Sequence, residues 1–143
     1  MVIRIKFVCI ILFVLTLLDS GIIVSLADVE GTWKINGFGA DSMALTRVGN
    51  QVYGTYNTPQ GQGTIYGIIN AQNVWKGTWS EPFNDDWGYF SATFSNDTSH
   101  LCGSWKYASS DYDTHDLYIP FNGYWDGNFQ GEKQFQANTS INA

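Results

Sequence analysis

The sequence predicts an all-β protein, an antiparallel up-and-down meander of about eight to ten strands that forms a closed or nearly closed barrel. Five copies of one pattern support this prediction. Each copy has an apolar residue, any residue, Gly, a small polar residue and an aromatic residue, and the copies occupy residues 29–33, 52–56, 75–79, 101–105 and 125–129. Their glycines are spaced 23, 23, 26 and 24 residues apart, about the length of one β-hairpin. Closure is favoured over an open sheet because it leaves no exposed strand edge.

Within each copy the residue types alternate as they do along a half-buried strand. Successive side chains of a strand point to opposite faces, so the apolar residue, the Gly and the aromatic residue share one face. The residues between them are mostly polar, which is typical of an antiparallel sheet with one solvated side. A Gly between two large residues leaves space for a ring from a neighbouring strand, or permits the bend that barrel closure needs.

Residues 1–27 have the features of a secretory signal peptide. Two basic residues precede a mainly apolar run at 7–18, and small residues occur at both cleavage-determining positions of Ser25-Leu26-Ala27. The mature protein is therefore expected to start at Asp28 and to be secreted, or to be associated with the cell surface if the segment is retained.

Residues 28–136 are expected to form a single β-barrel domain, followed by a flexible tail at 137–143. Aromatic residues would supply the core, since each buries a large area. After residue 27 the acidic residues outnumber the basic ones, twelve to five, which argues against nucleic acid and anionic membranes as partners. Cys102 is the only cysteine of this mature segment, so no internal disulfide is expected.

Return strands are predicted between the five copies, which gives nine or ten strands in all. They cover residues 41–48, 62–69, 87–95 and 116–121, and one more short strand is expected at 133–136. Pro120 cannot donate a hydrogen bond to a neighbouring strand, so the strand at 116–121 is expected at an edge or to end there.

One aromatic residue of each copy is predicted to point inward, at a common level of the barrel. These residues are Trp33, Tyr56, Trp79, Trp105 and Phe129. They would form either a solid aromatic layer or the wall of a pocket, because a barrel of eight or more strands is just wide enough for both arrangements.

The segment from Gly31-Thr32-Trp33 to Gly54-Thr55-Tyr56, with Met43 and Leu45 between, resembles the opening of avidin-type calycin barrels. Fatty-acid-binding proteins open with a similar Gly-x-Trp. The resemblance covers about residues 29–56. It implies ligand contacts from Ser42 and Tyr56, with aromatic walls from Trp79 and Trp105. Asn36 lies one residue later than the ligand-binding Asn of the avidin pattern. The whole chain also resembles uncharacterised exported Gly-Trp-repeat proteins of microbes.

The sequence predicts no enzyme, no cofactor and no metal site. Asp111, Asp113 and Asp116 offer oxygen ligands for Ca²⁺, but their segment lacks the Gly and the closing Glu of an EF-hand loop and is interpreted as a solvated acidic turn. His100 and Cys102 are too few ligands for zinc.

A glycosidase needs two facing carboxylates. Glu81 with Asp85 or Asp86 would supply them, but these residues are interpreted as loop acids. No nucleophile elbow, phosphate loop or dinucleotide fingerprint occurs.

Two functions are consistent with these observations. The first is a non-catalytic exported barrel that binds a small apolar or aromatic molecule, with contacts from Trp33, Ser42, Tyr56, Trp79, Trp105 and Phe129. The alternative is an extracellular carbohydrate-binding or structural module that acts through outward aromatic residues, namely Tyr53, Tyr66, Tyr89 and Tyr124. An empty interior of a few hundred Å³ would favour the first, and a filled interior the second.

Overall fold

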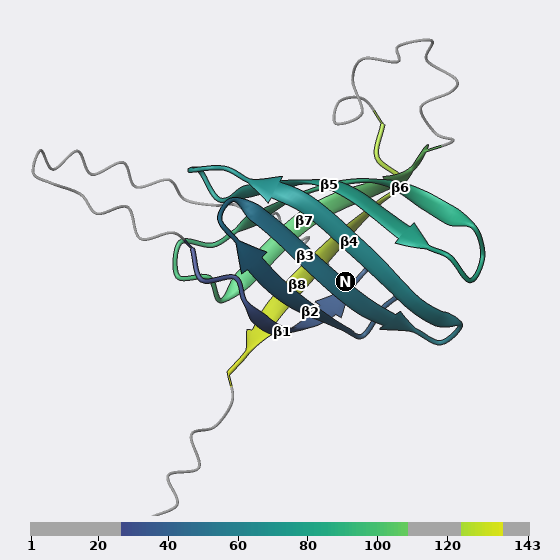
Figure 1. Ribbon diagram of the computed structural model, residues 1–143, viewed down its shortest axis with the longest axis horizontal. Coiled ribbons are helices and arrows are strands. Elements are labelled where there is room, and N and C mark those ends of the chain that lie inside the picture. The colour runs from purple at the N-terminus through teal and green to yellow at the C-terminus, as the bar shows by residue number, and fades with distance from the viewer. Residues whose placement is uncertain (1–26, 109–123, 136–143) are drawn as a thin grey trace, which may run out of the picture.

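Eight antiparallel strands form a closed barrel in the computed structural model, which describes residues 27–108 and 124–135 (Figure 1). Each strand pairs with the next one in sequence, and the last pairs with the first. The predicted fold class is therefore confirmed. The strands are β1 (Gly31–Asn36), β2 (Ser42–Val48), β3 (Gln51–Thr58), β4 (Gly61–Ile69), β5 (Val74–Glu81), β6 (Asp86–Phe94), β7 (His100–Tyr107) and β8 (Gly127–Gln134).

Strand β8 closes the barrel by pairing with β7 on one side and β1 on the other. It includes Lys133, so the separate strand expected at 133–136 is instead the end of β8. The reason is that the buried positions continue in alternation from Phe129 to Gly131, so the strand does not stop after the fifth copy.

Several predicted segments lie outside the described residues. They are the signal peptide except for its last residue, the strand at 116–121, and the tail at 137–143. The part of the chain that the structure describes contains no helix with the length and apolar character needed to cross a membrane.

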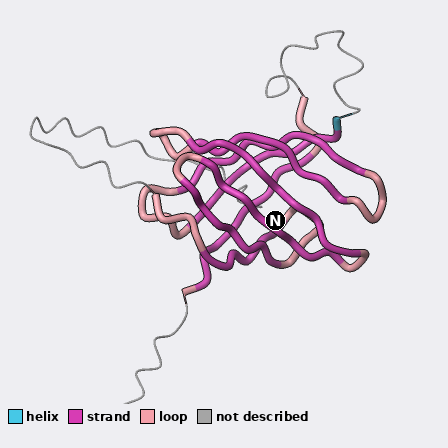
Figure 2. Tube along the Cα trace, in the orientation of Figure 1, coloured by secondary structure: helices cyan, strands magenta, loops and turns pink. Residues whose placement is uncertain are grey.

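The strand connections lie at the two ends of the barrel, and Figure 2 shows that most of the described chain between them is strand. One end, called the mouth here, carries the connections at 37–41, 59–60 and 82–85, together with residues 108 and 124–126. The opposite end, called the base, carries residues 27–30 and the connections at 49–50, 70–73 and 95–99. This arrangement follows from the meander, because every second connection returns to the same end.

Glycines of the repeated pattern allow aromatic rings to lie against the backbone of a neighbouring strand. A Cβ atom on Gly127 would lie 2.7 Å from the Nε1 atom of Trp105, and one on Gly103 would lie 2.6 Å from the ring of Phe129. Such contacts are shorter than van der Waals separations, so a side chain at either position would displace the ring. This is the use of glycine that the alternation predicts.

The interior of the barrel is packed with side chains. Toward the base, the ring centroids of Trp33 and Phe94 are 5.4 Å apart, and those of Trp75 and Phe90 are 4.4 Å apart. The indole Nε1 of Trp33 donates a hydrogen bond of 3.0 Å to the Val29 carbonyl, which joins the segment before β1 to this layer. A solid aromatic layer thus fills this half of the barrel, and Trp33 is the one member of the predicted inward set that these contacts place in it.

Candidate functional site

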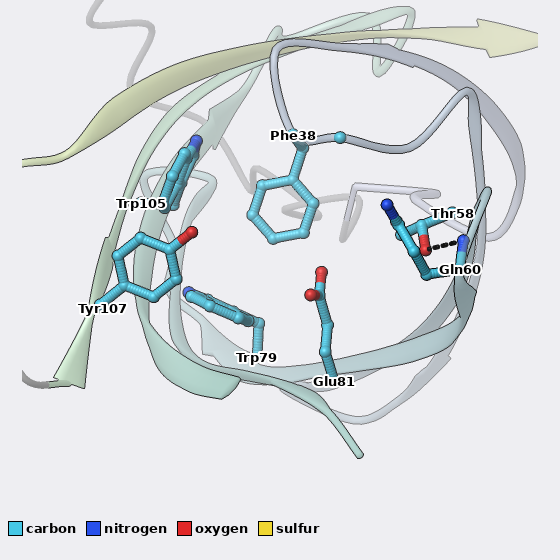
Figure 3. A pocket seen from close by; sticks show the side chains of 8 residues that line it. Phe38, Thr58, Gln60, Trp79, Glu81, Trp105 and Tyr107 are labelled. Carbon is cyan, nitrogen blue, oxygen red and sulfur yellow. Dashed lines mark hydrogen bonds between the residues drawn. The ribbon is translucent and has the colours of Figure 1, made fainter. Parts of the chain in front are cut away.

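A cavity of about 230 Å³ lies at the mouth of the barrel (Figure 3). Its walls come from four segments that are distant in the sequence: the β1–β2 loop, the β3–β4 turn, the end of β5 and the end of β7. The lining residues are Phe38, Gly39, Thr58, Gln60, Trp79, Glu81, Trp105 and Tyr107. The cavity is thus a product of barrel closure, which brings these strand ends to one place.

Phe38 points into the barrel and separates the cavity from the packed interior (Figure 3). Its ring centroid lies 5.0 Å from that of Tyr56 and 5.1 Å from that of Phe129, and the residue is only 7% exposed. Gly37 and Gly39, on either side, have positive φ angles of 92° and 71°. Residues with a Cβ rarely adopt this conformation, so the two glycines allow the loop to turn its phenyl ring inward.

Three further aromatic residues border the cavity. The ring centroids of Trp79 and Tyr107 are 5.5 Å apart, and those of Trp105 and Tyr107 are 5.3 Å apart. The planes of Trp79 and Trp105 meet at 89°, an edge-to-face arrangement that aromatic quadrupoles favour. Mutual contacts of this kind hold the rings in place at the rim.

Both indole N–H groups at the mouth donate to backbone carbonyls. Trp105 Nε1 donates to the carbonyl of Gly37 at 3.1 Å. Trp79 Nε1 lies 3.3 Å from the carbonyls of Tyr89 and Lys106. These donors are therefore already engaged, and the two tryptophans offer the cavity chiefly their apolar ring surface.

Glu81 supplies the charged group of the cavity. Tyr56 Oη donates a hydrogen bond of 3.1 Å to its Oε1 atom, and Asn84 Nδ2 donates one of 3.1 Å to its Oε2 atom. The carboxylate points into the mouth beside Trp79 (Figure 3). Each oxygen thus has one partner and keeps further capacity to accept a hydrogen bond.

Burial raises the pKa of Tyr56 far above its ordinary value, and the negative charge of Glu81 and their hydrogen bond add to this effect. The pKa of Tyr107 is also raised, first by burial and then by the charges of Asp86, Glu81 and Asp126. Both phenols therefore stay protonated at neutral pH, and the mouth has a negative electrostatic environment.

The structure distributes the predicted ligand-binding residues over different parts of the barrel. Trp79 and Trp105 line the cavity, and Tyr56 contacts it through Glu81. Phe129 lies beneath Phe38 in the packed interior. Four of the five aromatic residues thus contact Phe38, but Trp33 does not, so the five do not share one level as predicted.

Trp33 and Ser42 do not reach the cavity. Trp33 packs against Phe94 toward the base, because it lies near the basal end of β1 whereas Tyr56 lies near the mouth end of β3. Ser42 begins β2 and is opposite Asn57 of β3, outside the lining residues.

Six lining residues are not among the ligand contacts that the sequence predicts: Phe38, Gly39, Thr58, Gln60, Glu81 and Tyr107. The Gly-Phe-Gly triplet at 37–39 was an available indication, since flanking glycines with positive φ angles permit an inward loop. Glu81 was interpreted as a loop acid, but it is the last residue of β5, where its side chain points into the barrel mouth. No motif indicates the position of Tyr107.

Comparison of the chain with protein-family models, curated proteins and solved structures found no match. The resemblance to avidin-type barrels and to exported Gly-Trp-repeat proteins therefore stays a prediction. The site is interpreted from its own residues alone.

The other chemical candidates are dispersed or lie outside the described residues, with the exception of Glu81 and Asp86. The candidate calcium ligands lie outside the described residues; they are Asp111, Asp113 and Asp116. Within the part of the chain that the structure describes, no three His, Cys, Asp or Glu side chains form a group suited to a metal ion. His100 Nδ1 lies 2.7 Å from Ser99 Oγ at the base. Glu81 and Asp86 are register partners on adjacent strands.

Cys102 is half-buried on β7 and takes part in a disulfide bond. The only other cysteine of the sequence is Cys9, outside the described residues. The expectation of no internal disulfide concerns residues 28–143 alone and stays a prediction.

The outward tyrosines lie on the barrel wall, away from the mouth cavity. Tyr53 on β3 is 44% exposed and Tyr66 on β4 is 38% exposed, and their ring centroids are 4.8 Å apart. Tyr124 is also exposed, whereas Tyr89 is half-buried and packs against Trp87. Tyr53 and Tyr66 thus present a pair of adjacent rings to solvent on the outer wall.

Proposed function

We propose that this protein is a non-catalytic exported β-barrel that binds a small molecule with apolar or aromatic groups at its mouth. The observation that carries the proposal is the mouth cavity of about 230 Å³, bordered by Phe38, Trp79, Trp105 and Tyr107. Ligand sites are typically concave, largely apolar and fitted with a few polar groups that fix orientation. Glu81, Thr58 and Gln60 supply such groups here.

The cavity size limits the ligand. Drug-sized ligands occupy pockets of about 300–1,000 Å³, whereas a cavity of about 150 Å³ holds one benzene molecule. A volume of about 230 Å³ therefore suits a molecule of roughly one ring or a short branched chain. The interior below Phe38 is packed, which by itself favours the alternative function, so this proposal rests on the mouth cavity.

Nuclear magnetic resonance of the indole N–H groups tests this proposal. Benzyl alcohol and p-cresol serve as neutral probes and are titrated into the purified protein. We expect saturable shifts of the indole signals of Trp79 and Trp105, which border the cavity, and unchanged signals of Trp33 and Trp75, which are fully buried in the interior. Shifts at Trp33 or Trp75 without shifts at Trp79 and Trp105 would contradict binding at the mouth, and so would no saturable shift with either probe.

A matched pair of variants separates the cavity from the outer wall. Trp105→Phe changes a lining residue, whereas Trp87→Phe makes the same substitution at a half-exposed residue of β6 outside the lining. Only Trp105→Phe is expected to weaken binding of the probes. Equal weakening by both variants would argue against the cavity.

The alternative function is an extracellular carbohydrate-binding or structural module, and the adjacent exposed rings of Tyr53 and Tyr66 favour it. Exposed aromatic rings provide stacking surfaces for sugars. In this case the protein would be retained by insoluble cellulose or chitin, and Tyr53→Ala would release it while the indole signals of Trp79 and Trp105 stayed unchanged.

A further inference from the structure

A single carboxylate lies among the aromatic rings that border the mouth cavity. Glu81 is the charged residue of the lining, and no lysine or arginine is among the described residues that border the cavity. Its two oxygens accept hydrogen bonds from the neutral donors Tyr56 and Asn84. Neutral donors orient the carboxylate but do not cancel its charge, so the cavity keeps a net negative charge.

Aromatic rings next to this carboxylate add a second source of attraction for a positive charge. Phe38 stands at 82° to Trp79 and at 89° to Trp105, with ring centroids 6.0 and 6.2 Å apart. Aromatic faces attract cations through the ring quadrupole, and sets of such rings are the usual environment for quaternary ammonium groups. A carboxylate beside several rings therefore fits a cation that also carries apolar groups.

An anion or a strong acceptor would find few partners here. The indole N–H groups of Trp79 and Trp105 are engaged by backbone carbonyls. The hydroxyl of Thr58 donates to the Gly61 carbonyl at 3.0 Å. Three of the hydrogen-bond donors at the cavity are therefore already engaged within the protein.

Three basic side chains of the described residues have contacts outside the cavity. Arg47 donates to the Ala27 carbonyl and Lys133 to the Asp28 carbonyl, both at the base. The ammonium group of Lys106 lies 5.1 Å from the ring centroid of Trp125, and Lys106 is not a lining residue. None of these three side chains lines the cavity.

The connections at the mouth are also acidic, like the cavity lining. The described residues of these connections, 37–41, 59–60, 82–85, 108 and 124–126, contain three aspartates (Asp41, Asp85 and Asp126) and no lysine or arginine. A cluster of one charge sign raises the local concentration of the opposite charge and accelerates its association. The acidic connections would therefore attract cations toward the cavity.

We propose that the ligand of the mouth cavity is a small organic cation, an ammonium group that carries methyl or other short alkyl substituents. The alkyl groups lie against Phe38, Trp79, Trp105 and Tyr107, and the positive charge faces the carboxylate of Glu81. This inference rests on the proposed function, because it names the ligand class of the same cavity.

Choline and its uncharged isostere dimethylbutanol, in which carbon replaces nitrogen, provide the test. Both are titrated into the purified protein, and binding is followed by calorimetry and by the indole signals of Trp79 and Trp105. We expect choline to bind about tenfold or more tightly than the isostere, as a cation–aromatic contact combined with a facing carboxylate predicts. This comparison uses the unaltered protein and does not depend on the folding of a variant.

Glu81→Gln removes the charge and keeps a side chain of similar shape. It is expected to abolish the preference for choline while the isostere binds as before. The control is Glu132→Gln, which removes one negative charge from an exposed position on β8, outside the cavity lining. This control is expected to keep the preference for choline.

The outcomes separate the two proposals. If choline and dimethylbutanol bind equally, or the isostere binds more tightly, the cation inference is wrong and the proposed function stands. Retention of the preference in a folded Glu81→Gln protein would also overturn the inference. If neither compound nor the neutral aromatic probes shift Trp79 and Trp105, both proposals fail.

Discussion

The indole Nε1 of Trp105 donates a hydrogen bond of 3.1 Å to the carbonyl oxygen of Gly37, which precedes it by 68 residues. This bond joins the mouth end of β7 to the loop that carries Phe38. It gives Trp105 two roles: its ring borders the cavity, and its N–H holds the loop that separates the cavity from the interior.

Trp105→Phe is expected to weaken ligand binding while the protein stays folded. The substitution keeps an apolar ring but removes the donor to Gly37, and a hydrogen bond of this kind contributes about 0.5–1.5 kcal/mol to the free energy of unfolding. Denaturant unfolding measures this cost, and titration with choline or benzyl alcohol measures binding. An unfolded variant would show that Trp105 is a structural residue of the barrel rather than a binding residue.

Trp79→Ala is expected to lower the free energy of unfolding by about 3–5 kcal/mol, the range for loss of a large buried aromatic side chain. Trp79 is 4% exposed. Its neighbour Thr78 is exposed on the outer face, so Thr78→Ala should cost less than about 1 kcal/mol. Chemical denaturation of both variants makes the comparison, and equal costs would contradict the observed alternation of β5.

Stability is expected to fall in alkaline solution because of Tyr56. The pKa of this buried phenol is raised above its ordinary value of 10.0. Below about pH 10 the phenol is neutral in both states, and the full contribution of Tyr56 to stability is present. Above that pH the unfolded state loses the proton first, so stability decreases as pH rises toward the folded pKa.

Unfolding experiments at several pH values from neutral to alkaline measure this decrease. Tyr56→Phe removes the titrating group, so its stability should depend less on alkaline pH than that of the unaltered protein. If the stability of Tyr56→Phe fell as steeply with alkaline pH as that of the unaltered protein, other groups, such as Tyr107, would be the cause of the decrease.

The mature N-terminus is expected at Asp28, within about two residues. The structure also limits how far along the chain the mature N-terminus can lie. Val29 is fully buried and its carbonyl accepts the hydrogen bond from Trp33, so the N-terminus is expected to precede Val29. Intact-mass measurement on secreted material checks this prediction. Recovery of only the full-length chain in the membrane fraction would contradict it.

The sequence by itself determined the barrel architecture and the faces of its strands. The pattern around Val52, Gly54 and Tyr56 alternates with a period of two, and all three residues are buried in β3. Because this period is a local property of the chain, side-chain direction can be inferred without knowledge of the neighbouring strands. Repetition of the pattern then predicted a meander, and the structure confirms it.

Only the tertiary structure decided which of the inward aromatic residues border a cavity. Trp33 and Trp79 have equivalent places in the repeated pattern, yet Trp33 packs toward the base and Trp79 borders the mouth. The level of a residue depends on where its strand begins and ends, and the inward position of Phe38 depends on the conformation of a loop. Glu81 joins this site because strand pairing around the closed barrel brings the mouth ends of β3, β5 and β7 together. These relationships depend on how distant strands pair, and no local pattern of residues indicates them.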